Sequence, residues 1–434
     1  MISVMKKLVN IIVFVALSFV MMAQDNIQSP QATMALSLEE YRQKVLDYSQ
    51  ELKQAQEAVS GADYQRKAAV MGYLPRLDFS ADVSYGLTAS HFLNQTLDPF
   101  NYSVGANLVQ NVFAGGAIMA QHKMAKTDVE IAELSEQLTK EEVLYRAEMV
   151  YWNAAASKEM LENAESYYAL VMDLFNVVDQ RFEEGMVSKS DLLMVNTRLK
   201  EAELQRNSAK RVAAVAFQNL NILMGQPVQK PIDITDDIYV VTPMPEQKTL
   251  DAILSQRPEY LLVDRNIQKQ QQYVSAIYAQ YNPMIAVGVR GAWGTPTINF
   301  DGSASFGATA YATLSVPLLE WGKRTFTANA ARTEVSRLNL EKVRVKDQIN
   351  SEMSSAWISL NDNYKQIQIA RDNFVIASDN LELNNLRYKE GQLPILDVLS
   401  SQLSWIQAFN AIVQAEFSFK SAYADYKKAI GDMD

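Results

Sequence analysis

The chain has 434 residues, a formal net charge of −10 at neutral pH and no cysteine. The acidic balance argues against a nucleic-acid partner, because binding to phosphate needs clustered Lys and Arg. The absence of cysteine excludes disulfide bonds and a lipid attached to an N-terminal cysteine. Any attachment to a membrane is therefore expected to come from the fold.

Residues 1–23 are predicted to be an export signal peptide. Lys6 and Lys7 precede an apolar run from Leu8 to Met22, and Ala23 follows as the small residue at the cleavage site. The run is shorter than the ~20 residues that a membrane-spanning helix needs. No later stretch reaches that length either, so a location in a membrane would require strands.

The first mature segment predicts a helix over 36–71, with Ser37 as its N-cap and a proline at its end. The sequence then changes to a period of two. Apolar residues alternate with Asp, Ser, Gly and Thr over 77–87, and a second alternating run covers 102–108. These runs predict a β-hairpin at about 74–113, with an exposed loop at 89–101.

A long helix is predicted next, because residues 117–181 contain neither glycine nor proline. Unbroken, it would extend roughly 95 Å at ~1.5 Å per residue. Gly185 marks a tip, and a return helix follows over 192–223. Apolar residues recur at intervals of seven, which predicts coiled-coil packing; the set begins with Ile131, Leu138, Tyr145 and Trp152.

The second half repeats this order. A proline-rich linker at 227–248 is expected to pack as a belt outside the helices, and a second hairpin is predicted at about 283–316 with its loop at 295–303. A long helix over 323–386, a tip near Gly391 and a return helix complete the chain. The predicted seam uses Met353, Leu360, Ile367, Phe374 and Leu381, then Leu396, Leu399, Leu403, Ile406, Val413 and Phe417.

The two halves are a duplication. Residues 181–193 align without a gap with 387–399, at an offset of 206 residues. A unit of about half the chain has therefore been repeated. The predicted organisation is a signal peptide (1–23), a first repeat (24–226), a linker (227–248) and a second repeat (249–434).

Four predicted strands are too few to close a barrel. An open sheet in lipid would leave backbone groups unpaired at its edges, and the smallest membrane barrels have about eight strands. Several copies would have to share one barrel, and two or three copies are both compatible with the strand pattern. A soluble, half-buried sheet is the alternative interpretation of the same alternation.

The chain resembles the TolC-like outer membrane efflux proteins, the outer membrane factor family. The resemblance covers nearly the whole mature chain. It depends on five segments in this order: Leu36-Ser37-Leu38-Glu39-Glu40, Tyr73-Leu74-Pro75, Val112-Phe113-Ala114-Gly115-Gly116, Val316-Pro317-Leu318-Leu319-Glu320-Trp321-Gly322, and the duplicated Arg-aromatic-x-Glu-Gly tips at 181–185 and 387–391.

This resemblance implies a mainly helical protein with membrane strands. Three copies would form a homotrimer with a twelve-stranded β-barrel in the outer membrane lipid of a Gram-negative bacterium, and a periplasmic helical tunnel. Partners would be a periplasmic adaptor (membrane fusion) protein and an inner-membrane pump, driven by protons or by ATP. The implied function is a passive exit duct for drugs, metals or other small toxic compounds, with no enzymatic activity and no cofactor.

The resemblance also assigns residues at the tips. Adaptor docking is assigned to Gly185, Met186, Val187 and Ser188, and to Gly391, Gln392, Leu393 and Pro394. Asp397 would face the axis and form an acidic ring, although a second acidic position is Ser400 here. Asp191 and Tyr388 would tie the hairpins together in the closed state. The basic partner of that latch is replaced by Leu393.

Residue chemistry gives no support for an enzyme. The chain has two histidines and no metal-ligating, phosphate-binding or nucleophile motif. Two further interpretations stay open. One is the exit duct of a type I peptide or protein secretion system. The other is a non-conducting periplasmic coiled-coil scaffold, against which the polar face of the strands argues.

Overall fold

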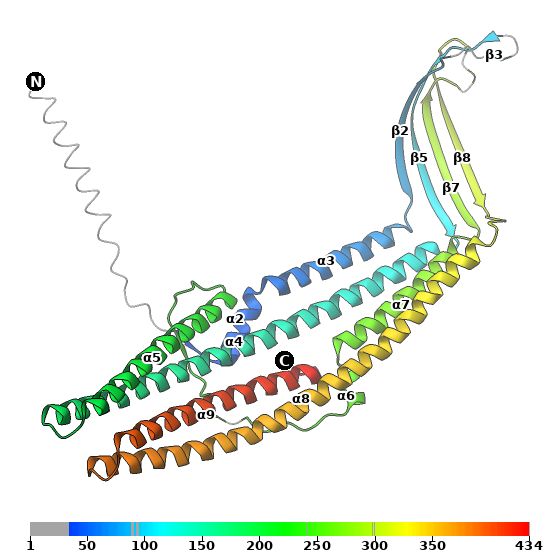
Figure 1. The fold of residues 1–434 in the computed structure, drawn as a ribbon. Helices are drawn as coiled ribbons and strands as arrows, with labels where there is room; N and C mark the ends of the chain where they lie inside the picture. The colour runs from blue at the N-terminus through cyan, green and yellow to red at the C-terminus, as the bar shows by residue number, and fades with distance from the viewer. Residues whose placement is uncertain are drawn as a thin grey trace, which may run out of the picture. The chain divides into compact units, whose positions relative to one another are not determined.

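The structure is a computed structural model that describes residues 34–87, 91–92, 95–240, 242–296, 298 and 300–433 (Figure 1). The predicted export signal at 1–23 lies outside the described residues. The chain forms two compact units, and each contains segments of both sequence repeats. None of the helices in the described part combines the length and the hydropathy needed to span a membrane.

The first unit consists of three chain segments: the residues up to 49, residues 146–244 and residues 360–424. It holds strands β1 (Met34–Leu36) and β6 (Ile232–Ile234), helix α2 (Leu38–Tyr48), the C-terminal parts of α4 (Ala117–Glu183) and α8 (Lys323–Lys389), and the return helices α5 (Lys189–Leu223) and α9 (Ile395–Ile430). Helices α4 and α5 form one antiparallel hairpin, and α8 and α9 form another (Figure 1). Apolar side chains of all four helices meet in a shared core.

The second unit covers 50–145, 245–359 and the last residues from 425. It contains the N-terminal parts of α4 and α8, together with α3 (Gln50–Met71), β2 (Arg76–Tyr85), β5 (Phe100–Ala114), α6 (Leu250–Leu254), α7 (Pro258–Ala279), β7 (Met284–Gly294) and β8 (Ser305–Ser315). The four long strands form one antiparallel sheet in the order β2-β5-β7-β8 (Figure 1). The two predicted hairpins are thus confirmed, and β5 pairs with β7 to join them.

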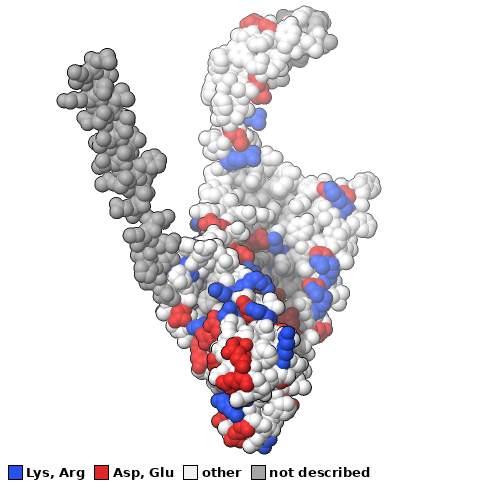
Figure 2. Space-filling view, turned by 60° about the vertical axis from the view of Figure 1, so that its left-hand side comes forward, with Lys and Arg blue, Asp and Glu red and all other residues white. Residues whose placement is uncertain are grey.

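The sheet has one apolar and one polar face, as the alternation predicts. Register places Phe79 opposite Ala106 and Val104 opposite Trp293, so that apolar side chains line up across strands. This face is uncovered within the chain: Phe79 is 73% exposed. On the other face Tyr311 donates a hydrogen bond to Asn107 at 2.9 Å. Few charges appear on the strands in the view of Figure 2.

Two strand details differ from the prediction. Within the expected loop at 89–101, strands β3 (His91–Phe92) and β4 (Gln95–Thr96) pair as a short hairpin. In β5 the register shifts between Asn111 and Phe113. Such a bulge increases local twist where a strand leaves the sheet.

The predicted helix over 36–71 is wrong as a single element. Residues up to Leu36 form β1 instead, and Ser49 leaves helical geometry at ψ 116° to separate α2 from α3. The ring of Tyr48 packs on Gly225, where a Cβ would lie 2.2 Å from a ring carbon. Ser37 is the N-cap of α2, as predicted, and accepts a hydrogen bond from the amide of Glu40 at 3.4 Å.

The linker is fastened to the helices of the first unit by named contacts. Its strand β6 pairs in parallel with β1. Asp236 accepts hydrogen bonds from the amide of Leu38 at 2.6 Å and from the hydroxyl of Tyr151 at 2.7 Å. Further along, Lys420 donates to the carbonyl oxygen of Val240 at 2.8 Å, and burial lowers the pKa of this lysine. Tertiary contacts that connect distant residues therefore hold a segment with little secondary structure.

The predicted seams hold for most positions. Met353, Leu360, Ile367 and Leu381 are buried, as the intervals of seven require. The prediction that Leu396 belongs to the seam is wrong, because Leu396 is 61% exposed while its neighbour Ile395 is buried. The first turn of α9 turns Ile395, Val398 and Leu399 toward the core, which leaves Leu396 on the outer side of the helix.

The duplication is visible in the elements. Helices α4 and α8 each have 67 residues, and both of their ends are offset by 206 positions. At the start of α4, Gly115 and Gly116 have φ values of 63° and 94°. The counterparts before α8 are Trp321, at φ 48°, and Gly322. Trp321 is 87% exposed, so its side chain meets no packed neighbour there, although the left-handed backbone itself stays strained for a residue with a Cβ.

Gly115→Ala is expected to destabilise the fold more than Gly185→Ala does. Both glycines have positive φ, which costs an alanine about 1–2 kcal/mol. A Cβ on Gly115 would also lie 2.4 Å from the carbonyl oxygen of Ala279, whereas Gly185 has nothing within 4 Å. Thermal unfolding of the purified variants measures the difference. Equal losses would show that the strand–helix junction relaxes freely.

Candidate functional site at the two helical tips

Both long helices end in the same hydrogen-bonded turn. The amide of Gly185 donates to the carbonyl oxygen of Phe182 at 2.9 Å, and that of Met186 donates to Arg181 at 2.8 Å. In the second repeat Gly391 and Gln392 make the equivalent bonds at 3.0 and 2.9 Å. This is a Schellman motif, which needs a left-handed residue at its glycine; φ is 74° at Gly185 and 73° at Gly391.

The eight residues predicted to dock an adaptor occupy these two turns. Met186 is 70% exposed, and Ser188, Gln392 and Pro394 are exposed too. Val187 and Leu393 are half-buried and pack on the apolar core beneath the tips. Each tip therefore consists of a solvent-exposed turn that is anchored to the apolar core by one half-buried residue.

That core joins four helices. Its buried members come from α4, α5, α8 and α9: Leu174, Val178, Val195, Tyr388, Ile395, Val398 and Leu399. Apolar burial of this kind stabilises a domain by about 25 cal/mol per Å². The two tips are consequently held in one cluster within a chain and are not two independent hairpins.

Asp191 and Asp397 are equivalent in sequence but differ in environment. Asp191 accepts hydrogen bonds from the Ser188 hydroxyl at 2.9 Å and the Ser188 amide at 3.2 Å, and the Ser188 oxygen accepts in turn from the amide of Asp191. This capping box closes the start of α5. In the second repeat Pro394 stands where Ser188 does and has neither an amide proton nor a hydroxyl. The carboxylate of Asp397 is therefore exposed and is not engaged in a cap.

A cation links the two tips, and the sequence analysis did not assign it this role. The Arg181 guanidinium lies 5.1 Å from the centre of the Tyr388 ring. It donates to the carbonyl oxygens of Tyr388 at 3.5 Å and Lys389 at 3.2 Å. A cation at a helix C-terminus stabilises the helix dipole by about 0.3–1 kcal/mol. The repeated motif contains Arg181, but only the fold shows that it reaches the other hairpin.

Asp191 and Tyr388, the two residues expected to tie the hairpins together, form no hydrogen bond with each other in the structure. The Asp191 carboxylate is already bound by Ser188, and Tyr388 packs in the apolar core. Burial raises the pKa of the Tyr388 hydroxyl, against the opposing effect of the Arg181 charge. Besides the shared core, the polar link between the hairpins is therefore Arg181 of α4, whose guanidinium caps the end of α8.

A shallow groove of about 410 Å³ lies between α5 and α9, next to the tips. Apolar and polar residues line it: Met194, Thr197, Arg198, Glu201, Leu396, Leu399, Ser400 and Leu403. Arg198 and Glu201 pair at 2.7 Å on its rim. The exposed Leu396, misplaced in the predicted seam, belongs to this groove.

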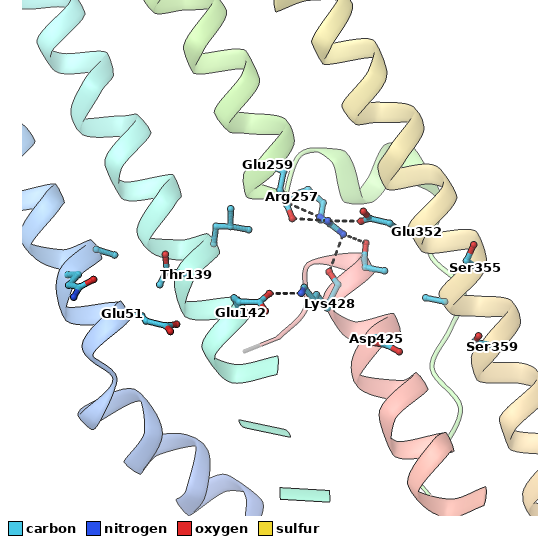
Figure 3. A pocket seen from close by; sticks show the side chains of 15 residues that line it. Glu51, Thr139, Glu142, Arg257, Glu259, Glu352, Ser355, Ser359, Asp425 and Lys428 are labelled. Atoms are coloured by element: carbon cyan, nitrogen blue, oxygen red, sulfur yellow. Dashed lines mark hydrogen bonds and ion pairs between the residues drawn. The ribbon is translucent and has the colours of Figure 1, made fainter. Parts of the chain in front are cut away.

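A larger cavity of about 1060 Å³ lies in the second unit, and five acidic and two basic side chains line it together with neutral ones (Figure 3). Arg257 closes one side and is only 3% exposed. It donates to the carbonyl oxygen of Ala429 at 2.6 Å and binds Glu259 and Glu352, so it caps the end of α9. Lys428 pairs with Glu142 at 2.5 Å. The charges mainly neutralise one another, and the described residues contain no cluster suited to a metal ion.

The comparison with protein families decides the identity. The model of the family described as "Outer membrane efflux protein" matches residues 24–226 and 249–432. The chain belongs to the outer membrane efflux protein family. The two matched segments correspond to the two repeats and leave the linker between them.

Individual relatives are distant. The alkaline protease secretion protein AprF of Pseudomonas aeruginosa is 22% identical over 404 residues, which cover 87% of this chain and 81% of AprF. The outer membrane channel CmeC of Campylobacter jejuni superposes with a TM-score of 0.78 at 19% identity and covers 91% of this chain and 85% of its own. The outer membrane protein VceC of Vibrio cholerae superposes with a TM-score of 0.76 at 15% sequence identity. The match covers 91% of this chain and 96% of VceC. These structures share the fold of the efflux protein family.

Asp191→Ala is expected to lower the free energy of unfolding by about 1 kcal/mol, the usual net contribution of a lost hydrogen bond, because it removes the carboxylate half of the capping box. Asp397→Ala is expected to lower it by less, because Asp397 forms no capping box and only its charge in the first turn of α9 is lost. Circular dichroism during thermal unfolding compares the two variants. An equal loss in both would show that Asp397 also has a structural role in its helix.

Proposed function

We propose that this efflux protein is the passive exit duct of a tripartite export system. Three copies form a twelve-stranded barrel in the outer membrane and a periplasmic helical tunnel. The tips of the tunnel dock to a periplasmic adaptor, which connects them to an inner-membrane pump. The duct catalyses no reaction and binds no cofactor.

The observation that carries this proposal is the uncovered four-stranded sheet. Its apolar face is exposed within the chain, and β2 and β8 each have one edge that no other described strand pairs with. In lipid, every unpaired backbone group is costly, so the edges must meet other edges. Closure of the barrel with further copies pairs these edges. The polar face of the sheet then lines a water-filled lumen; one row across this face consists of Asp78, Asn107, Arg290 and Thr309.

The tips are the proposed adaptor surface. Glycine turns expose Met186 and Gln392, and the core beneath them keeps both tips in place. Small polar and apolar side chains suit the docking of a helical hairpin. The groove between α5 and α9 supplies apolar depth beside the turns.

Asp397 is the proposed selectivity residue. Its carboxylate is exposed and makes no cap, so three copies near one axis would form an acidic ring. Like charges on a narrow ring attract cations and repel anions. Asp191 and Tyr388 act in the gate as supports, since Asp191 closes the start of α5 and Tyr388 anchors the end of α8.

Asp397→Ala is expected to weaken the preference of the reconstituted pore for cations and its block by trivalent cations. Single-channel recording in a planar bilayer measures both quantities. Asp191→Ala is the comparison variant: its carboxylate is bound by Ser188, so its removal is expected to reduce stability without changing ion selectivity. Unchanged selectivity in the Asp397 variant would refute the acidic ring, and an absence of conductance would favour a scaffold.

Two cargo classes follow from the relatives. The family model describes efflux, whereas AprF is described as a secretion protein for alkaline protease. A duct for small toxic compounds and a duct for a secreted polypeptide need the same fold, because each requires only a wide and polar lumen. The pump that drives export distinguishes them.

Photo-crosslinking from Met186 and Gln392 in cells is expected to capture a periplasmic adaptor. Both side chains project from the tips, while the buried Val398 directly beneath gives the matched negative control. Mass spectrometry then identifies the adaptor and the pump that copurifies with it. A proton-driven pump indicates small-molecule efflux and an ATP-driven exporter indicates secretion. Capture of no adaptor would contradict the tripartite mechanism.

A further inference from the structure

The two tips of one chain are joined by an asymmetric contact, in which the first repeat donates and the second repeat accepts. Arg181, at the end of α4, caps the end of α8 through the carbonyl oxygens of Tyr388 and Lys389. Its guanidinium also stacks over the Tyr388 ring. One repeat therefore supplies the cation and the other supplies the ring and the helix end.

The duplication gives each partner in this contact a counterpart. At the offset of 206 residues, Arg181 corresponds to Arg387, Tyr388 to Phe182 and Lys389 to Glu183. The second repeat thus has the cation, and the first repeat has an aromatic ring followed by a helix end. All components of a second, equivalent contact are present in the chain.

The second contact is not made within one chain. The side chain of Arg387 is exposed, and it forms no hydrogen bond or ion pair with the described residues. In the turn at the end of α4, the carbonyl oxygens of Gln180, Arg181 and Phe182 accept hydrogen bonds from backbone amides. The carbonyl oxygen of Glu183 receives no backbone donor among the described residues. In the other tip, the equivalent carbonyl of Lys389 is the one that Arg181 caps at 3.2 Å.

We propose that Arg387 caps the end of α4 in a neighbouring copy of this chain. Its guanidinium stacks over the Phe182 ring and donates to the carbonyl oxygens of Phe182 and Glu183 of that copy. A contact between two different surfaces of neighbouring copies builds a closed ring when the rotation that relates one copy to the next returns to the first copy. In the trimer of the proposed function, on which this inference depends, alternating contacts within and between copies would connect all six tips.

Charge supports a second copy as the occupant. The first tip carries the exposed acidic side chains Glu183 and Glu184 next to the open carbonyl, and an arginine is attracted to such a site. The second tip has Lys389 at the position of Glu183. The contact between copies would therefore have an additional charge attraction that the contact within a chain lacks.

The native chain contains no cysteine, which permits a direct test. Arg387→Cys combined with Glu183→Cys is expected to react with a short bismaleimide and give bands at two and three times the monomer mass. Neither single variant should do so. Arg181→Cys with Lys389→Cys is the matched control, which should crosslink within one chain and stay at the monomer mass.

A second variant covers the case in which the cysteine pair fails to assemble. Arg387→Lys keeps the positive charge, and a carbodiimide should join its amine to the Glu183 carboxylate of another copy. Mass spectrometry of mixed light and heavy isotope-labelled chains identifies that junction as intermolecular. The native mass of the untreated protein is measured in the same preparation.

The outcomes separate the two hypotheses. Trimers without a 387–183 link between copies would overturn this inference and leave the exit duct intact. A 387–183 link found only within single chains would also overturn it. A protein that is monomeric in every preparation would refute both the trimer and the ring of tips. Links between mixed-label copies, together with the intramolecular control link, support the proposal.

Discussion

The unsatisfied edge of the four-stranded sheet is the constraint on which the proposed assembly depends. Backbone amides and carbonyls at the free edges of β2 and β8 need partners if the apolar face lies in lipid. One chain supplies no further long strand among its described residues. Assembly of several copies is then a condition for a stable membrane segment, and the helices that continue from the strands are brought together by the same symmetry.

The duplication gives equivalent positions in the two repeats, and the side chains at these positions now make different contacts. Ser188 caps α5 through Asp191, whereas Pro394 leaves Asp397 unengaged. Gly115 is packed too tightly for a side chain, while its counterpart Trp321 is exposed. Arg181 is used inside the chain and Arg387 is not. In each pair the position in the repeat is retained, whereas the surroundings and contacts of the side chain differ.

Elements with strong periodicity could be predicted from the sequence. Glycine-free and proline-free runs specify α4 and α8, alternation specifies the four long strands, and the repeated glycines specify the tips. The contacts of the linker could not be predicted, since they depend on partners such as Tyr151 and Lys420 that are distant in the sequence. The break at Ser49 and the exposure of Leu396 were missed for the same reason. Arg181 was recognised as part of a motif, but its acceptor lies 208 residues away.

The tips combine a fixed apolar core with weak, reversible links. Each cation at a helix end contributes about 0.3–1 kcal/mol, so the six links of the proposed ring would sum to roughly 2–6 kcal/mol. A shift of a two-state equilibrium from 1:99 to 99:1 requires about 5.5 kcal/mol. An adaptor that competes for the same turns would therefore need only ordinary binding energy to open the tunnel. Because these links cap helix ends and meet the buried core at the Tyr388 ring, opening would leave the rest of the packing beneath the tips intact.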